Sequence, residues 1–245
     1  MAVLTIRQAL DRFVAEEGAR APASSTDVGR ALENLEAFLE SHGYQYVDEE
    51  DEEYVDEDDA SFDDEERSFL EANTPDILPA SLTEFLFEWQ IRDDPSEAEE
   101  ARATSQVAER LMDWLAEERL ARVADARDAA LLARKAADEV PRAKRLGSLL
   151  YPLTQEVSQE QPTSDDEVVE DFLRIVRVEP GQLWLEQEVG PISVPEEASA
   201  IASVGWWINV VAARLGGTWY LSEVGNVYPL LAEGGDEDWD EPEAD

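Results

Sequence analysis

The sequence predicts an α+β protein in which an N-terminal all-α helical domain is followed by a small five-stranded β-barrel. Up to about residue 150, apolar residues recur every three or four positions, the spacing of one helix face. Beyond residue 168, short β-branched and aromatic runs alternate with Gly and Pro turns. We therefore expect four segments: a helical domain over 1–150, a linker over 151–167, a barrel over 168–231 and a disordered acidic tail over 232–245.

The first two helices are indicated by their caps and by their apolar spacing. Thr5 is a suitable N-cap for the first helix, and Ser25 or Thr26 for the second. The second helix is expected to end at His42-Gly43, where the glycine is a C-cap signal. The side chains expected on the buried faces are Ile6, Leu10, Phe13 and Val14 in the first helix, and Val28, Leu32, Leu35, Phe38 and Leu39 in the second.

Further helices are predicted up to residue 140. Ser81 and Glu84 have the spacing of a capping box, which marks the start of a helix. A longer helix passes through Trp114, and the alanine-rich stretch 120–139 continues helically until Pro141, which we expect to end it. The side chains expected on one face of this last stretch are Val123, Ala130, Leu131 and Arg134.

The strands of the barrel follow from short β-rich runs bounded by turn residues. A closed barrel would also protect the strand edges from unwanted pairing. The predicted strands lie at 172–178, 183–186, 192–194, 206–213 and 218–224, with a helical turn at 195–200.

Acidic residues dominate the composition. The chain has 59 Asp and Glu against 19 Lys and Arg, a formal net charge of −40 in 245 residues. Such a charge destabilises a compact fold by self-repulsion. Salt screens the repulsion, because the Debye length shrinks from about 8 Å at 0.15 M to about 3 Å at 1 M. We therefore interpret the protein as one from a salt-accumulating halophile. Residues 48–66, with 14 acids and no base, are expected to form an acidic insertion in the helical domain.

The sequence gives little support to catalysis or cofactor binding. The chain has no cysteine and one histidine, His42, which excludes thiolate metal sites and zinc sites with several histidines. The acidic insertion lacks the Gly and Glu spacing of an EF-hand, and there is no P-loop. We predict a protein that is not an enzyme and that has no metal or cofactor. No stretch approaches the roughly 20 apolar residues that span a bilayer, so we expect a cytoplasmic protein that does not bind membranes.

The basic residues are concentrated in one segment. Residues 119–145 carry eight of the 19 bases, including both lysines, against four acids. This segment is either a helix whose bases pair with the protein's own acids, or a docking surface for an acidic partner or for phosphate groups. The predicted partner-binding residues, several of which are spaced to form one helical stripe, are Arg127, Arg134, Lys135, Arg142, Lys144 and Arg145.

Two tryptophans of the barrel complete the predicted site. Strand alternation places Trp206 and Trp207 on opposite faces, so they cannot both point into a single small core. Trp184 likewise lies on the face opposite Leu185. We predict that Trp184 and Trp207 contact a partner, the alternative being that they pack against the helical domain.

The apolar positions of the first 120 residues follow a pattern found in one family. The positions concerned are Thr5, Ile6, Ala9, Phe13, Ser25, Thr26, Leu32, Leu35, Phe38 and Leu39, with Val107, Leu111, Trp114, Leu115, Glu118 and Leu120 in a last helix. With them the chain resembles the helical SAM-like core-binding domain of tyrosine recombinases, which implies DNA binding. The insertion at 48–66 departs from the pattern. Recombinase activity is excluded, because no histidine follows His42 to complete that family's catalytic domain. The C-terminal part looks like an SH3-like or OB-like barrel.

Three function classes remain. We favour a non-catalytic binding or adaptor protein that contacts an acidic protein partner through the basic stripe. The alternative is a DNA- or RNA-binding accessory protein related to the recombinase core-binding domain. Repulsion between nucleic acid and a chain of charge −40 counts against it, and the salt that screens this repulsion also weakens phosphate contacts. An enzyme that uses carboxylates is the third class. The oligomeric state stays open.

Overall fold

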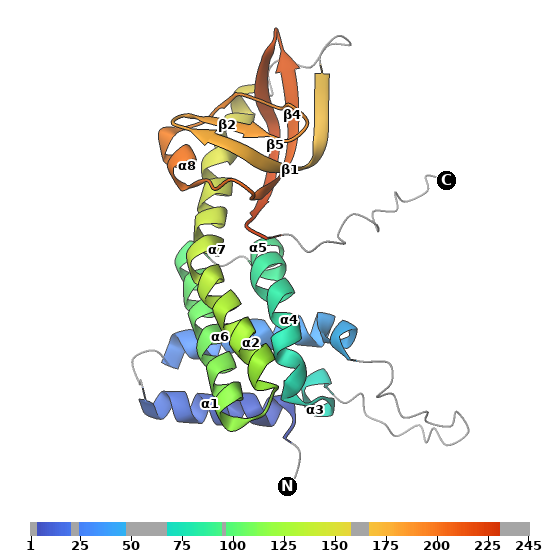
Figure 1. The fold of residues 1–245 in the computed structure, drawn as a ribbon, viewed down its shortest axis with the longest axis vertical. Coiled ribbons are helices and arrows are strands. Elements are labelled where there is room, and N and C mark those ends of the chain that lie inside the picture. Colours follow the sequence, from blue (N-terminus) through green and yellow to red (C-terminus); the bar gives the residue numbers. More distant parts are fainter. Residues whose placement is uncertain (1–3, 21–24, 48–67, 95–96, 158–166, 231–245) are drawn as a thin grey trace, which may run out of the picture. The chain divides into compact units, whose positions relative to one another are not determined.

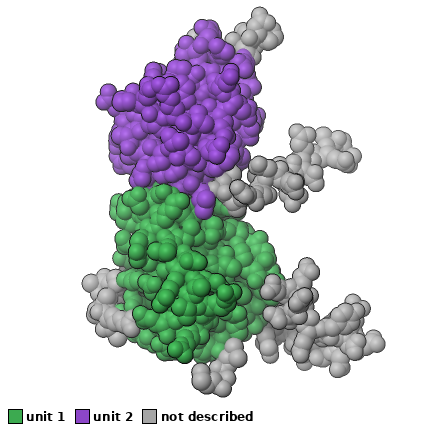
Figure 2. Space-filling view, in the orientation of Figure 1, with its two compact units in different colours: residues 1–141 green, residues 142–245 purple. Residues whose placement is uncertain are grey.

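Helices come first and strands second along the chain, which confirms the predicted α+β class (Figure 1). The computed structural model describes residues 4–20, 25–47, 68–94, 97–157 and 167–230. It divides into two units, Met1–Pro141 (unit 1) and Arg142–Asp245 (unit 2), which Figure 2 distinguishes by colour. The predicted acidic insertion at 48–66 and the predicted tail at 232–245 lie outside the described residues.

Unit 1 is helical, and its two N-terminal helices bury the faces that the sequence predicts. Val14 is the exception, because it is 41% exposed. The elements of unit 1 are α1 (Ile6–Arg20), α2 (Ser25–His42), the 3₁₀ turn η2 (Gly43–Tyr46), α3 (Phe69–Ala72), the 3₁₀ turn η5 (Pro75–Ile77), α4 (Leu78–Glu84), the π-helical turn η6 (Phe85–Trp89), α5 (Gln90–Arg92), α6 (Ala98–Glu118) and the first part of α7 (Val123–Val157).

The predicted capping box does not start a helix. Helix α4 begins at Leu78, and Pro79 lies in its first turn, where the missing N–H of proline costs no hydrogen bond. Ser81 is already inside the helix, and its hydroxyl donates to the carbonyl of Leu78 at 3.0 Å. The prediction of a helix start at Ser81 is therefore wrong by one turn.

Helix α7 passes through Pro141, so the prediction that this proline ends the helix is wrong. Proline lacks the N–H that would bond to the carbonyl four residues earlier, which here belongs to Ala137. Arg102 of α6 supplies a donor instead, with Nη1 at 3.0 Å from that carbonyl. The helix continues to Val157. Residues 151–157, predicted as the start of the linker, are therefore helical, and the rest of the predicted linker up to 166 lies outside the described residues.

The face that α7 buries in unit 1 is made of small side chains. Of the four residues predicted to share one face, Ala130 is buried, whereas Val123, Leu131 and Arg134 are exposed, Val123 by 39% and Leu131 by 59%. The buried side chains of α7 are mostly alanines, and alanine carries little hydrophobic signal in a sequence. The buried residues of α7 in this unit are Ala126, Ala129, Ala130, Ala133, Ala136, Ala137, Val140 and Pro141.

Unit 2 contains a ring of five strands. The hydrogen-bonded order is β1-β2-β3-β5-β4, and β4 pairs back to β1 over eight residue pairs, so the ring closes. The β3–β5 pairing is parallel and short, with Ile192 opposite Trp219. The elements are β1 (Glu167–Glu179), β2 (Gln182–Leu185), β3 (Ile192–Ser193), the short helix α8 (Glu196–Ile201), β4 (Trp207–Leu215) and β5 (Thr218–Tyr228).

The core of unit 2 includes the second part of α7. Ala143, Leu146 and Leu150 lie on one face of this helix and are fully buried among the inward side chains of the strands. Ile175 and Trp206 belong to the same cluster. Residues 142–150, which the sequence assigned to the helical domain, are thus part of the strand unit, because their apolar face completes its core.

Candidate partner-binding surfaces

The residues of the predicted basic stripe do not share one surface. Arg142 is half-buried in unit 2, where its Nη2 donates to the Ile201 carbonyl at 2.9 Å and to Ser203 Oγ at 2.8 Å. Its guanidinium lies over the Trp206 ring, 5.0 Å from the centroid. Arg142 therefore joins α7 to the end of α8 and to the segment that precedes β4, and this is a structural role.

The two other bases of unit 2 also have contacts within the chain. Arg145 is exposed and pairs with Glu197, and this hydrogen bond raises the pKa of Arg145. Lys144 is half-buried and engaged with neighbouring groups. Because both side chains have contacts within the chain, neither Arg145 nor Lys144 extends the basic stripe of unit 1.

Arg134 and Lys135, in unit 1, are exposed but paired. Arg134 donates through Nε and Nη2 to one oxygen of Glu109 at 2.8 and 2.6 Å, and this hydrogen bond raises the pKa of Arg134. Lys135 Nζ lies 3.6 Å from Glu139 and 6.0 Å from the centre of the Phe87 ring. These contacts agree with the interpretation that the helix is partly saturated by the protein's own acids.

One row on α7 faces solvent and combines apolar with basic side chains. Val123, Arg127, Leu131 and Lys135 are spaced four residues apart, so they lie on one side of the helix; we call them the α7 outer row. All four are exposed, Leu131 by 59%. Arg127 has no ion pair or hydrogen bond with any residue that the structure describes. Two members of the row, Arg127 and Lys135, belong to the predicted stripe, and Lys135 is paired with Glu139.

Trp184 and Trp207 lie on the outer side of the strand ring, half-buried beneath arginines of β1. Arg174 is paired directly with Trp207 across β1 and β4, and its guanidinium lies 5.5 Å from the ring centroid. Arg177 is paired with Trp184 across β1 and β2, with a distance of 4.4 Å. We call these four residues the Arg–Trp face. It gives each predicted tryptophan a cation–π contact, a favourable arrangement for a surface aromatic.

The sequence analysis missed Arg174 and Arg177. The signal was present, because antiparallel pairing of the predicted strands 172–178 and 206–213 brings an arginine opposite a tryptophan. The contact depends on the strand register and on an irregularity in the pairing between Ile175 and Arg177. Ile175 is buried, and strict alternation would turn Arg177 inward as well, but the irregularity leaves Arg177 on the outer side. Neither the register nor the irregularity can be read from the composition of the strands.

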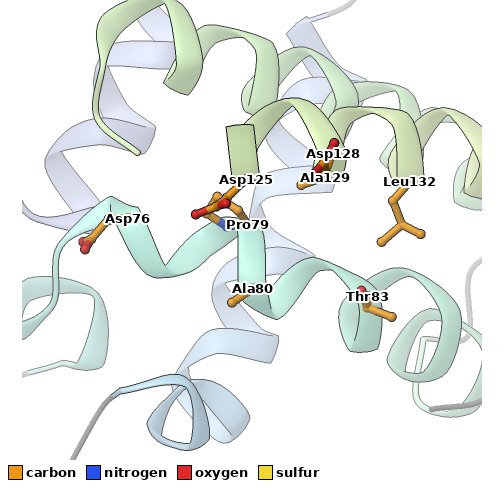
Figure 3. A pocket seen from close by; sticks show the side chains of 8 residues that line it. All are labelled: Asp76, Pro79, Ala80, Thr83, Asp125, Asp128, Ala129 and Leu132. Carbon is orange, nitrogen blue, oxygen red and sulfur yellow. The ribbon is translucent and has the colours of Figure 1, made fainter. Parts of the chain in front are cut away.

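A pocket of about 420 Å³ lies in unit 1 (Figure 3). Three carboxylates stand around small apolar side chains, and all three are exposed. Asp125 is paired with Arg122 at 3.4 Å, and Asp76 accepts a hydrogen bond from Thr74. Because no charge is buried there, the pocket shows no sign of a built ligand site. Its lining comes from η5, α4 and α7: Asp76, Pro79, Ala80, Thr83, Asp125, Asp128, Ala129 and Leu132.

His42 has a local role at the end of α2. Its ring stacks on Phe38 with 5.3 Å between centroids and an angle of 11°. Its Nδ1 lies 2.7 Å from Ser41 Oγ, but that hydroxyl is 2.9 Å from the Ala37 carbonyl and donates to it. These contacts hold the imidazole ring at the end of α2.

Among the described residues, no group of three His, Asp or Glu side chains could hold a metal ion. None of the helices described is long and apolar enough to cross a membrane. No protein-family model matches the chain, and no curated protein and no solved structure is significantly similar to it.

Proposed function

We propose that the chain is a non-catalytic cytoplasmic adaptor of a halophile, and that it binds an acidic protein partner through the α7 outer row. The observation that carries this proposal is the exposure of Leu131, at 59%, between Arg127 and Lys135. An apolar side chain with a base one turn away on either side is complementary to an amphipathic segment that places carboxylates around an apolar residue. The partner is therefore expected to present such an acidic helix.

The chemistry of the row suits binding in concentrated salt. At about 1 M salt the Debye length is about 3 Å, so only charges in direct contact attract. Arg127 can form a bidentate pair with a carboxylate. Full burial of a Leu side chain contributes roughly 1.5–3 kcal/mol, and salt does not weaken this contribution. Because Lys135 is paired with Glu139, Arg127 and Leu131 should supply most of the affinity.

Photo-crosslinking tests the proposal directly. A photoreactive phenylalanine analogue replaces Leu131 in one full-length chain and Tyr151 in a second. Tyr151 is the matched control, because it lies on the same helix and is 58% exposed. Irradiation in the salt-rich lysate of the native cells should join position 131 to a defined acidic protein, and position 151 should not give that adduct.

A second substitution shows whether the row itself makes the contact. Arg127→Glu in the position-131 chain should remove the adduct without lowering Tm, since Arg127 pairs with no described residue. Arg122→Glu is the control, because this base is 81% exposed and precedes the helix. An adduct that survives Arg127→Glu, or the same adduct from position 151, would refute the proposal. Cross-linking to nucleic acid at position 131 would favour the accessory-protein alternative implied by the recombinase resemblance.

We also propose that the strand ring of unit 2 is a small β-barrel of the SH3-like or OB-like kind. The closed pairing order and the single core filled from its inner side support this. In such a barrel the outer side chains, including the Arg–Trp face, are the ones free to contact other segments.

A further inference from the structure

The Arg–Trp face is built across three neighbouring strands. β1 pairs with β2 on one side and with β4 on the other. β1 supplies both arginines, and each flanking strand supplies one tryptophan. Val176, between the arginines, is 46% exposed. The result is a continuous outer surface of two guanidinium groups, two half-exposed indoles and an exposed apolar side chain.

The arginines of this face keep unused hydrogen-bond donors. A guanidinium has five N–H groups. Arg174 gives two of them to one oxygen of Glu186, at 2.9 and 2.6 Å, and Arg177 gives one to Glu179. These ion pairs are exposed, and exposed pairs exchange partners at little cost. The face can therefore bind carboxylates next to an aromatic group without losing a buried contact.

We propose that the Arg–Trp face binds the acidic segment 233–245 of the same chain. This segment has eight Asp and Glu, no base, and one aromatic residue, Trp239, with acids on both sides of it. Carboxylates of the segment contact Arg174 and Arg177, and the Trp239 ring packs beside the indoles of the face. The composition of the segment and that of the face are thus complementary in charge and in aromatic character.

The connection along the chain places this segment within reach of the face. Strand β5 ends at Tyr228, which is paired directly with Trp207 of the face. Trp239 follows Tyr228 by eleven residues, and an extended chain of that length spans roughly 35 Å. A short connection of this kind gives an effective concentration in the millimolar range. An intrinsic Kd of about 1 mM is therefore enough for half occupancy.

This proposal does not depend on the α7 outer row, because it concerns other residues in the other unit. Bound in this way, the acidic segment would occupy the Arg–Trp face. External acidic ligands of that surface would then have to compete with the chain's own segment.

A single nitroxide label tests the proposal in the full-length chain. The protein has no cysteine, so Pro242→Cys gives a unique labelling site. The indole N–H signals of Trp184 and Trp207 are observed by NMR with the label oxidised and then reduced. If the segment binds the face, the oxidised label should remove most of the intensity of both signals. The spectrum with the label reduced supplies the reference intensity for each signal.

Two variants separate specific binding from chance proximity. Arg174→Ser with Arg177→Ser should restore both indole signals. Arg214→Ser is the matched control, because Arg214 also lies over a tryptophan (5.9 Å from the Trp219 centroid) and has an exposed ion pair with Glu167. This control should leave the broadening unchanged.

The proposal is overturned if the label leaves Trp184 and Trp207 unaffected, or if the broadening persists without the two arginines. It is also overturned if the broadening disappears on dilution, since the occupant would then be the segment of a second copy. Equal Tm values for the two variants and the parent chain show that lost broadening does not come from unfolding.

Discussion

Arg102 on α6 donates a hydrogen bond to the carbonyl of Ala137 on α7, and Pro141 is the residue that deprives this carbonyl of its helical donor. A side chain of α6 therefore satisfies the hydrogen-bonding capacity of a backbone carbonyl of α7. A buried carbonyl without a partner costs about 1–3 kcal/mol. The contact explains how α7 continues past a proline in its interior.

We predict that Arg102→Met lowers the free energy of unfolding by about 1–2 kcal/mol, because it leaves the Ala137 carbonyl without a donor. Pro141→Ala restores the helical N–H. In the Pro141→Ala background, Arg102→Met should therefore cost clearly less. Thermal unfolding of the four proteins at one fixed, high KCl concentration measures this coupling. Equal costs in both backgrounds would show that Arg102 acts only through its charge.

A second prediction separates the structural bases of α7 from its surface bases. Arg142→Met should destabilise the protein by about 1.5–3 kcal/mol, because it removes two hydrogen bonds from a half-buried charge and a contact over Trp206. Arg145→Met removes only an exposed pair with Glu197 and should change Tm little. Both variants remove one positive charge, so the change in overall repulsion cancels in the comparison. A similar loss in both would contradict the assigned roles.

Elements whose core is made of large apolar side chains could be predicted from the sequence. The buried face of α2 and the approximate positions of the five strands follow from spacing and turn residues, although β1 begins at Glu167 and not at 172, and β5 ends at Tyr228 and not at 224. The errors on α7 have a different origin. Its buried face consists of alanines, which carry little hydrophobic signal, and its proline is accommodated by Arg102 of another helix. Local sequence does not contain that distant donor.

Of the candidate partner-binding surfaces, the sequence alone indicates only which residue types are enriched in a segment. The excess of bases in 119–145 is visible in the sequence, but the sequence does not show that Arg142 turns toward Trp206 while Arg127 stays exposed. Both are arginines on one helix, but Arg142 lies in the part of α7 that contributes to the core of unit 2, whereas Arg127 is exposed on the part of α7 in unit 1. Likewise, Trp207 is predicted from the sequence as a partner-binding residue, but its contact with Arg174 depends on the strand register.

A third prediction concerns alkaline pH. Burial, and then the hydrogen bond to Glu84, raise the pKa of Tyr46 above its usual value of 10.0. Because the folded state holds this proton more tightly than the unfolded state, the stabilisation is complete below pH 10 and is lost as the pH rises above it. Tyr46→Phe should therefore lower Tm at neutral pH and flatten the decline of Tm above about pH 10.

The control for this prediction is Tyr44→Phe, because Tyr44 is 66% exposed and its hydroxyl has no hydrogen bond to the described residues. Tm is measured by circular dichroism at fixed salt from neutral to alkaline pH. A Tyr46→Phe protein whose Tm declines as steeply as that of the parent chain would contradict the assigned role of the Tyr46–Glu84 hydrogen bond.

The last prediction is that folding requires salt. A net charge of −40 repels itself over a Debye length of about 8 Å at 0.15 M salt, and over only about 3 Å at 1 M. Tm, followed by circular dichroism, should therefore fall steeply as KCl is lowered from about 2 M to about 0.1 M, with loss of the folded spectrum at the low end.

Reducing the charge without touching the described core tests whether repulsion is the cause. Replacing the 14 acids of 48–66 by their amides changes the net charge from −40 to −26. This variant should keep its fold at lower KCl than the parent chain, and sucrose at equal water activity should not replace the salt for the parent. If the parent keeps the same spectrum and Tm across the whole range, self-repulsion does not limit its stability, and the halophile interpretation fails with it. If both proteins need salt to the same degree, the requirement comes from strengthened burial of apolar groups and not from charge screening.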